Sequence, residues 1–287
     1  EEIVAALLTD ADTLAAAADG ILTADEQRTL RWRRPPRSWQ SARWTAADHV
    51  LLDEVAGLIE RPQTYGHIVV DEAQDVSPMQ ARALARRVGF GSVTVLGDLA
   101  QGTTPWAARS WPALLGHLGK PETTVVPLTV GFRIPAVLVA PANRLLAALD
   151  VDVPPARSLR GDGELRIRQV PDPVAGTVEA VRAALRHEGS IGVIAEAGAL
   201  PRLRAALIEA AIATADPADL GRSSARVTVL PASVAKGLEY DHVIAVEPAA
   251  IVAAETRGLH RLYVVLTRAV SRLDIVHHRP LPAELAE

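Results

Sequence analysis

The stretch that decides the fold of this chain is His67-Ile68-Val69-Val70-Asp71-Glu72-Ala73-Gln74-Asp75. Its three β-branched apolar residues predict a buried parallel strand that is covered on both faces of its sheet. The adjacent carboxylates Asp71 and Glu72 follow at the carboxyl end of that strand, where open α/β sheets bind ligands. One carboxylate there can hold Mg²⁺, usually through its waters, and the next can orient or deprotonate a water that attacks a γ-phosphate. Alternatively, the two acids belong to a strand-to-helix turn in which Asp71 caps the helix.

The composition is that of a globular protein without a global basic field. Of the 287 residues, 49% are apolar and 22% charged, which excludes a disordered chain and leaves room for one large domain or two. The absence of cysteine excludes a disulfide framework and cysteine-ligated zinc, and suits a cytoplasmic protein. No apolar run approaches the roughly 18–20 residues of a membrane span, and no signal-peptide pattern is present, so we expect no membrane partner.

The net charge of -4 means that nucleic-acid binding would need a local basic patch. The run of arginines at 31–37, broken by Pro35-Pro36, is either a solvated loop or a phosphate contact.

Apolar periodicity predicts an α/β protein with doubly wound parallel sheets. Residues 2–20 have helical spacing, Thr23 and Thr45 begin further helices, and strand, helix and strand then alternate from residue 68 to residue 96, as in a βαβ unit. A second alternating layer follows a Pro/Gly-marked connection. Its strands are expected at 165–170, 191–195, 226–230, 242–246 and 273–276, and its helices at 134–149, 173–187, 199–213 and 258–270. The predicted divisions are a helical lead-in (1–60), part of one α/β domain (61–127) and a second α/β domain (128–287).

Five motifs in a fixed order carry a resemblance to a known family. They are Asp71-Glu72-Ala73-Gln74-Asp75, Gly97-Asp98-Leu99-Ala100-Gln101, Leu128-Thr129-Val130-Gly131-Phe132-Arg133-Ile134-Pro135, Ala235-Lys236-Gly237-Leu238-Glu239-Tyr240-Asp241 and Leu262-Tyr263-Val264-Val265-Leu266-Thr267-Arg268-Ala269. The chain thereby resembles UvrD/Rep-type superfamily 1 helicases. Further details, including Trp106 and Val246-Glu247-Pro248, resemble the HelD-type branch, the RNA polymerase-associated motor ATPases.

The resemblance implies two RecA-like domains with ATP and Mg²⁺ between them. It implies that Asp71 holds Mg²⁺, Glu72 is the general base and Gln101 senses the γ-phosphate. Arg133 and Arg268 resemble the arginines that reach the γ-phosphate, where a planar guanidinium stabilises developing charge. Alternatively, Gly97-Asp98 is a capped turn, and the two arginines form ordinary surface ion pairs. Two further nucleotide contacts are implied by the resemblance: Glu239, at the ribose, and Gly237, in a tight backbone turn.

One departure from the family is the absence of a phosphate-binding loop. No Gly-x-x-x-x-Gly-Lys-Ser/Thr occurs, and the nearest piece, residues 116–121, has the wrong spacing and a Pro at the hydroxyl position. We therefore expect the chain to be the C-terminal portion of a longer protein, with a partial first RecA-like domain and a complete second one. We expect the longer protein to be an ATP hydrolase, and this chain alone to bind ATP weakly and to be nearly inactive.

A second departure concerns nucleic acid. In strand-translocating relatives, aromatic residues that follow the Gln101 position stack on bases. Here only Trp106 occupies such a position, and core packing or an interface is an equal alternative for it; Lys236 is a further candidate contact. This departure favours a HelD-like ATPase that remodels or recycles RNA polymerase. The alternatives are a DNA helicase or repair translocase of the UvrD/Rep type, and a non-catalytic interaction module.

Overall fold

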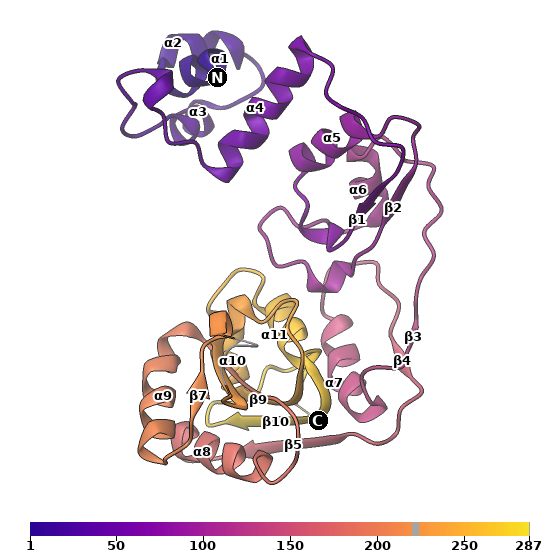
Figure 1. Ribbon diagram of the computed structural model, residues 1–287, viewed down its shortest axis with the longest axis vertical. Helices are drawn as coiled ribbons and strands as arrows, with labels where there is room; N and C mark the ends of the chain where they lie inside the picture. The colour runs from indigo at the N-terminus through magenta and orange to yellow at the C-terminus, as the bar shows by residue number, and fades with distance from the viewer. Residues whose placement is uncertain (220–223, 287) are drawn as a thin grey trace. The chain divides into compact units, whose positions relative to one another are not determined.

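The computed structural model of the protein describes residues 1–219 and 224–286. Its contacts define two compact units, the first of Glu1–Leu96 with Pro112–Thr123 and the second of Gly97–Trp111 with Thr124–Glu287. The elements of both are labelled in Figure 1. Among the described residues, no helix combines the length and apolar character that a bilayer crossing requires. The domain division made from the sequence stays a prediction.

The first unit begins with four helices, α1 (Glu2–Thr9), α2 (Ala11–Ala17), α3 (Ala24–Leu30) and α4 (Ala46–Ile59). The helical spacing over 2–20 is confirmed, but it belongs to two helices. Asp10 separates them, because its carboxylate accepts the backbone N–H of Asp12 at 2.9 Å and so caps α2. The helix starts expected at Thr23 and Thr45 are confirmed, since both threonines form capping boxes.

The predicted βαβ unit is confirmed. Strands β1 (Ile68–Val70) and β2 (Val93–Val95) pair in parallel, and α5 (Pro78–Arg87) connects them after the short helix η2 (Ala73–Asp75). The prediction that β1 is covered on both faces is wrong for the described residues. Val70 is buried, whereas Val69, which points to the opposite face, is 62% exposed. The physical reason is the small size of this sheet, whose two strands have only one face turned into a core.

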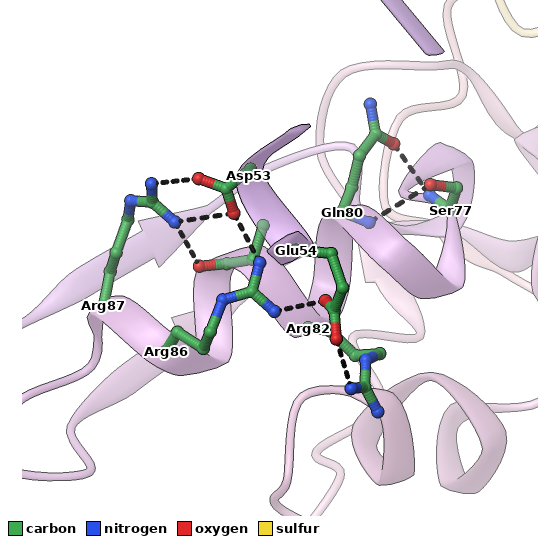
Figure 2. Close-up of polar contacts among 8 residues, drawn as sticks. Asp53, Glu54, Ser77, Gln80, Arg82, Arg86 and Arg87 are labelled. Carbon is green, nitrogen blue, oxygen red and sulfur yellow. Dashed lines mark hydrogen bonds and ion pairs between the residues drawn. The ribbon is translucent and has the colours of Figure 1, made fainter. Parts of the chain in front are cut away.

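A network of charged side chains joins α4 to α5 (Figure 2). Arg86 pairs with both Asp53 and Glu54, Arg87 pairs with Asp53, and Arg82 pairs with Glu54 at 2.5 Å. The hydrogen bond from Arg87 lowers the pKa of Asp53, and the one from Arg82 lowers the pKa of Glu54. Since both carboxylates are held ionised in the folded chain, their contribution to stability is present at neutral pH and is lost as pH falls through their lowered pKa values.

The double substitution Asp53→Asn, Glu54→Gln is expected to loosen α4 from α5. It removes the negative charge that compensates three clustered guanidinium groups, which then repel one another. Amide hydrogen exchange in α4 should accelerate roughly fivefold or more. The matched control, Asp19→Asn with Glu122→Gln, changes two exposed acids of the same unit and should leave exchange in α4 unchanged. Equal exchange in both variants would show that apolar contacts alone hold α4.

The second unit is built on a six-stranded parallel sheet with the order β5-β10-β9-β6-β8-β7. The strands are β5 (Glu164–Gln169), β6 (Ile191–Ala195), β7 (Thr214–Ala215), β8 (Val227–Pro231), β9 (Tyr240–Val246) and β10 (Ala269–His277). A separate two-stranded parallel sheet pairs β3 (Val130–Gly131) with β4 (Arg157–Ser158). The helices are α7 (Ala136–Leu146), α8 (Pro173–Ala184), α9 (Leu200–Glu209), α10 (Pro248–Ala253) and α11 (Gly258–Leu266). The short helices of the unit are η3 (Leu99–Gln101), η4 (Ala197–Ala199), η5 (Pro217–Asp219) and η6 (Ala232–Val234). Helix α6 (Trp111–His117) begins at Trp111 in the second unit, and its other residues belong to the first unit.

Helices cover both faces of the six-stranded sheet, as doubly wound architecture requires. On one face, side chains of α8 and α9 such as Val181 and Leu203 pack with Val193, Val229 and Ile244 of the strands. The neighbouring strand residues point the other way, and they pack with α7, α10 and α11 in a second core; these strand residues include Ile194, Leu230, Val243, Leu273 and Ile275. The predicted α/β class with a doubly wound parallel sheet is therefore confirmed for this unit.

Several predicted element boundaries need correction. The helix expected over 258–270 ends at Leu266, because Thr267, with φ -82° and ψ 3°, leaves the helical conformation and the chain then enters β10. Strand β10 is accordingly longer than the predicted 273–276. The helix expected over 199–213 ends at Glu209, and Ala211 has a positive φ of 58°, so the helix cannot continue.

Gly258 begins α11 where the backbone of α10 lies against it. A Cβ at Gly258 would lie 1.9 Å from the carbonyl oxygen of Val252, and no side-chain rotation can relieve a backbone clash. Gly258→Ala should therefore destabilise the second unit by about 3 kcal/mol, at the upper end of overpacking costs. Urea unfolding measures the change. Gly161→Ala is the control in the same unit, since a Cβ there meets nothing within 4 Å. A melt of Gly258→Ala that matches this control would contradict the expected clash.

Candidate functional site

In the first unit, the predicted carboxylates occupy a sharp turn at the end of β1. Glu72 has φ 53° and ψ 35°, a left-handed conformation that costs a non-glycine residue about 1 kcal/mol or more. The turn is fixed by the Ala73 N–H, which donates to the carbonyl of Leu96 at 3.0 Å, and by Asp71, whose Oδ1 accepts the Glu72 N–H at 2.8 Å. The alternative in which Asp71 caps the next helix is wrong in detail, because Glu72 is the residue that precedes η2.

The turn presents both acids at the surface. Asp71 and Glu72 are exposed, whereas Gln74 is fully buried and donates from Nε2 to Glu72 Oε2 at 2.6 Å. A buried amide therefore orients the Glu72 carboxylate. The described residues contain no cluster of three or more metal-ligating side chains. One exposed aspartate nevertheless fits Mg²⁺, which proteins commonly bind through one or two carboxylates together with waters and substrate phosphates.

A groove of about 570 Å³ lies beside this turn within the first unit. Its lining combines Glu72 and Asp75 with residues of α4 and α5, including His49, Asp53 and Gln80. Sequence patterns did not indicate it, because residues more than twenty positions apart form its walls.

In the second unit, the structure brings Gln101 and Arg268 together. Arg268 Nη2 donates to Gln101 Oε1 at 3.0 Å, although 167 positions separate the two residues. The guanidinium is held further by the carbonyls of Val264 and Leu238, at 3.0 and 3.3 Å, and the residue is only 4% exposed. Burial with several acceptors makes Arg268 a fixed cation and not a mobile surface charge.

Arg133 joins the same region through the turn that precedes β9. Its guanidinium forms an ion pair with Glu239, and both side chains are about half exposed. Arg268 donates to the carbonyl of Leu238, the adjacent residue, so neighbouring positions of one turn contact both arginines. Gly237 shapes that turn with a φ of 77°, which glycine adopts without strain. Gln101, Arg133, Gly237, Glu239 and Arg268 thus share one region of the second unit.

Several positioning residues were not predicted from the sequence. Asp98 accepts hydrogen bonds from the Ala100 N–H and from the Gln101 side-chain amide, both at 3.0 Å. The first bond confirms the interpretation of Gly97-Asp98 as a capped turn. The second bond orients the Gln101 side chain. The hydroxyl of Tyr263 also hydrogen-bonds Asp98, and burial raises the pKa of that phenol. For His260 and Tyr263, the only available signal was the helical period of α11, which places the two residues on one face.

His260 and Arg257 of the same region contact the segment around Gln101. Arg257 Nε donates to the carbonyl of Gly102 at 2.7 Å, and His260 Nδ1 lies 2.9 Å from the carbonyl of Ala100. The network implies a neutral imidazole that donates from Nδ1 and accepts from Arg257 at Nε2, 3.0 Å away. Burial lowers the pKa of His260, and the nearby Arg257 charge acts in the same direction.

Stability of the second unit is expected to fall as pH drops below about 6.5. The unfolded chain binds a proton at His260 more readily than the folded chain does, so acid favours unfolding, by up to about 1.4 kcal/mol per pH unit. Urea melts at pH 7.5 and 5.5 measure the loss. His260→Asn, which keeps an amide donor for Ala100, should reduce this pH dependence. An unchanged dependence would mean that other groups cause it.

The two predicted nucleic-acid contacts differ in exposure. Trp106 is 51% exposed, so its ring is not part of a core in the described chain. Lys236 is half-buried in the turn that also contains Gly237. The roles of these residues stay predictions.

Comparisons with known proteins give a limited result. No protein-family model and no curated protein matches the chain. The C-terminal domain of a possible DNA helicase from Lactobacillus plantarum matches with a TM-score of 0.41 and 21% identity, over 54% of this chain and 92% of that domain. An arterivirus nonstructural protein 10 (helicase) with DNA matches 75% of this chain with a TM-score of 0.39 and 21% identity. The PRRSV helicase matches 94% of this chain with a TM-score of 0.42 and 13% identity. The chain covers 40% and 46% of these two viral proteins, less than half of each.

Proposed function

We propose that the chain is the motor portion of a superfamily 1 helicase-type ATPase of the UvrD/Rep kind. The observation that carries the proposal is the hydrogen bond between Gln101 and Arg268, in a region where Arg133 and Glu239 pair on the adjoining turn. Each of these residues comes from a different motif. A fixed glutamine with two arginines suits a site that stabilises charge on a transferred phosphoryl group.

The acids of the first unit would supply the remaining chemistry. Asp71 is the oxygen ligand proposed for Mg²⁺, which when bound neutralises charge on phosphate oxygens. Glu72, oriented by Gln74, would accept the proton of the attacking water. The ion pair of Arg133 with Glu239 would open when the arginine turns to a phosphate, which leaves Glu239 available to a ribose hydroxyl.

The finer proposal is a HelD-like ATPase that remodels or recycles RNA polymerase. Two residues of this chain support the HelD-like proposal. Thr104 stands where translocating relatives have an aromatic residue, and Ala107 stands where they have an arginine. A DNA helicase or repair translocase is the second candidate, supported by the half-exposed ring of Trp106.

Steady-state ATPase assays of the intact protein test these proposals. Turnover stimulated by RNA polymerase and indifferent to single-stranded DNA supports the HelD-like function, whereas stimulation by single-stranded DNA supports the translocase. No Mg²⁺-dependent hydrolysis under any condition would contradict both and leave a non-catalytic interaction module. For the 287-residue chain alone, we expect calorimetry with ATP and Mg²⁺ to detect only weak binding; micromolar affinity would mean that a segment not identified from its sequence binds the phosphates.

A further inference from the structure

Charges of opposite sign occupy separate parts of the first 44 residues. Residues 1–26, which we name the acidic helices, contain seven acids and no basic side chain. Residues 31–44, which we name the Arg/Trp loop, contain five arginines, three tryptophans and no acid. Both segments belong wholly to the first unit and lie outside the proposed nucleotide site. Surfaces that avoid association usually intersperse the two signs of charge, and this part of the chain does not.

The acids of the acidic helices face solvent. Glu2, Asp12 and Asp19 form no ion pair with any residue of the described chain. Two apolar side chains are exposed among the acids, Ile3 by 52% and Ile21 by 76%. Exposed apolar side chains with charges around them are typical of a protein–protein interface, which has an apolar centre and a polar rim. All seven acids are exposed, namely Glu1, Glu2, Asp10, Asp12, Asp19, Asp25 and Glu26.

The Arg/Trp loop has a restricted conformation. The rings of Trp32 and Trp44 pack with centroids 5.3 Å apart and planes tilted by 60°, which holds the two ends of the loop together. The Trp32 N–H donates to the carbonyl of Leu8 in α1 at 2.8 Å, and this bond fixes the start of the loop on a helix. Inside the loop, Pro35-Pro36 fixes two backbone φ angles before the short helix η1 (Trp39–Ser41). Little conformational freedom is therefore lost when a partner binds.

The arginines of the Arg/Trp loop are not paired with the acids of their own copy. Arg33, Arg34, Arg37 and Arg43 are exposed, and none of them forms an ion pair with any residue that the structure describes. The restricted loop thus keeps its positive charge apart from the acidic helices, although both belong to the same 44 residues. Unpaired arginines in a solvated turn gain little for the fold, so folding does not explain their concentration here.

We propose that the first unit self-associates, with the Arg/Trp loop of one copy on the acidic helices of a second copy. Because every copy carries both surfaces, a two-fold axis lets the reverse contact form at the same time, and each loop then meets opposite charge. Guanidinium groups bind carboxylates bidentately, which gives the contact its geometry. A separate acidic protein would cover only the loop and leave the acidic helices unpaired. The proposal goes beyond the ATPase function and does not depend on it, since it needs neither nucleotide nor hydrolysis.

Sedimentation velocity of the 287-residue chain tests the proposal. Exposed ion pairs are weak and are screened by salt, so we expect reversible dimers at roughly 50 μM protein in 50 mM salt and monomers in 300 mM salt. The substitution Arg33→Glu, Arg34→Glu, Arg37→Glu reverses the charge of the loop. The substitution Glu2→Lys, Asp12→Lys, Asp19→Lys reverses the charge of the acidic helices. Each variant alone should self-associate at least tenfold more weakly, because both contacts of its dimer become repulsive.

An equimolar mixture of the two variants supplies the decisive measurement. In the mixed dimer, each reversed surface meets a surface of opposite sign, so association should recover to within about threefold of the unmodified chain. A misfolded variant cannot give this recovery. The control Arg182→Glu, Arg186→Glu, Arg202→Glu reverses three exposed charges of the second unit and should dimerise like the unmodified chain.

The apolar part of the contact is tested by Ile21→Ser, which should weaken association roughly fivefold. Ile208→Ser, which changes an isoleucine of the second unit that is 69% exposed, is its control and should have no effect.

Monomers at 200 μM protein in 50 mM salt would overturn the proposal. Dimers that persist in both reversed variants, or equal weakening in the arginine control, would overturn it as well. A monomeric chain whose Arg/Trp loop binds polyglutamate would also overturn it and assign the loop to a different acidic protein. ATPase activity of the intact protein is measured separately, so failure of one proposal is distinguishable from failure of the other.

Discussion

Replacing Glu72 by Gln in the intact protein is expected to lower kcat for ATP hydrolysis by about 10²–10⁴-fold while nucleotide affinity stays nearly unchanged. The glutamine keeps the size of the side chain but cannot accept a proton from water. The geometry supports this prediction, because Glu72 is exposed at the end of β1 and held in a left-handed conformation. Strain of this kind persists where the surrounding contacts impose it, here the bonds of Ala73 and Gln74.

Single-turnover hydrolysis and nucleotide binding measure the two parts of this prediction. Glu122→Gln, an exposed acid of the same unit, is the matched control and should turn over normally. Turnover of Glu72→Gln within a few-fold of the unmodified protein would remove Glu72 from the role of general base.

Replacing Arg268 by Ala should lower kcat on the order of 10³-fold, with a smaller loss of nucleotide affinity. An arginine that contacts the transferred phosphoryl group stabilises charge that grows in the transition state. Since Arg268 is buried and donates to Gln101, Val264 and Leu238, its removal should also destabilise the second unit. Arg268→Lys retains the charge but not the planar fork, and should recover stability more than turnover.

Arg133→Ala separates catalysis from folding. Its guanidinium is half exposed in its pair with Glu239, so the substitution should leave the urea midpoint unchanged while it lowers kcat. Arg144→Ala, an exposed arginine of α7, is the control for both variants. Wild-type turnover in either site variant would mean that the arginine in question forms an ordinary structural contact.

The fold of the second unit could be predicted from the sequence because its strands are continuous apolar runs. The predicted 191–195 coincides with β6, in which all five residues are buried. The end of α11 could not be located in this way. Its residues from Leu262 to Leu266 are buried on all sides, so apolar periodicity does not distinguish the helix from the strand that follows.

The candidate site was predictable only as separate motifs. Residue type and position after a strand indicated Glu72, and the family resemblance implied Gln101 and Arg268, but the hydrogen bond between the last two depends on tertiary contacts across 167 positions. The open face of β1 was not predictable for a related reason. Its apolar pattern is the same whether or not other strands and helices cover Val69, and the pattern therefore predicted a burial that the structure does not have.

The grouping of residues 97–111 with the second unit affects how this protein can be divided. The chain passes between the units three times, after Leu96, after Trp111 and after Thr123. A truncated chain that begins at residue 128 would leave Arg257, His260 and Arg268 without their acceptors in the segment from Ala100 to Gly102. Recombination of two genes only at the crossing after Thr123 would likewise separate these three residues from their acceptors. The second unit can therefore be exchanged between proteins as a module only if two separate stretches of the gene move together.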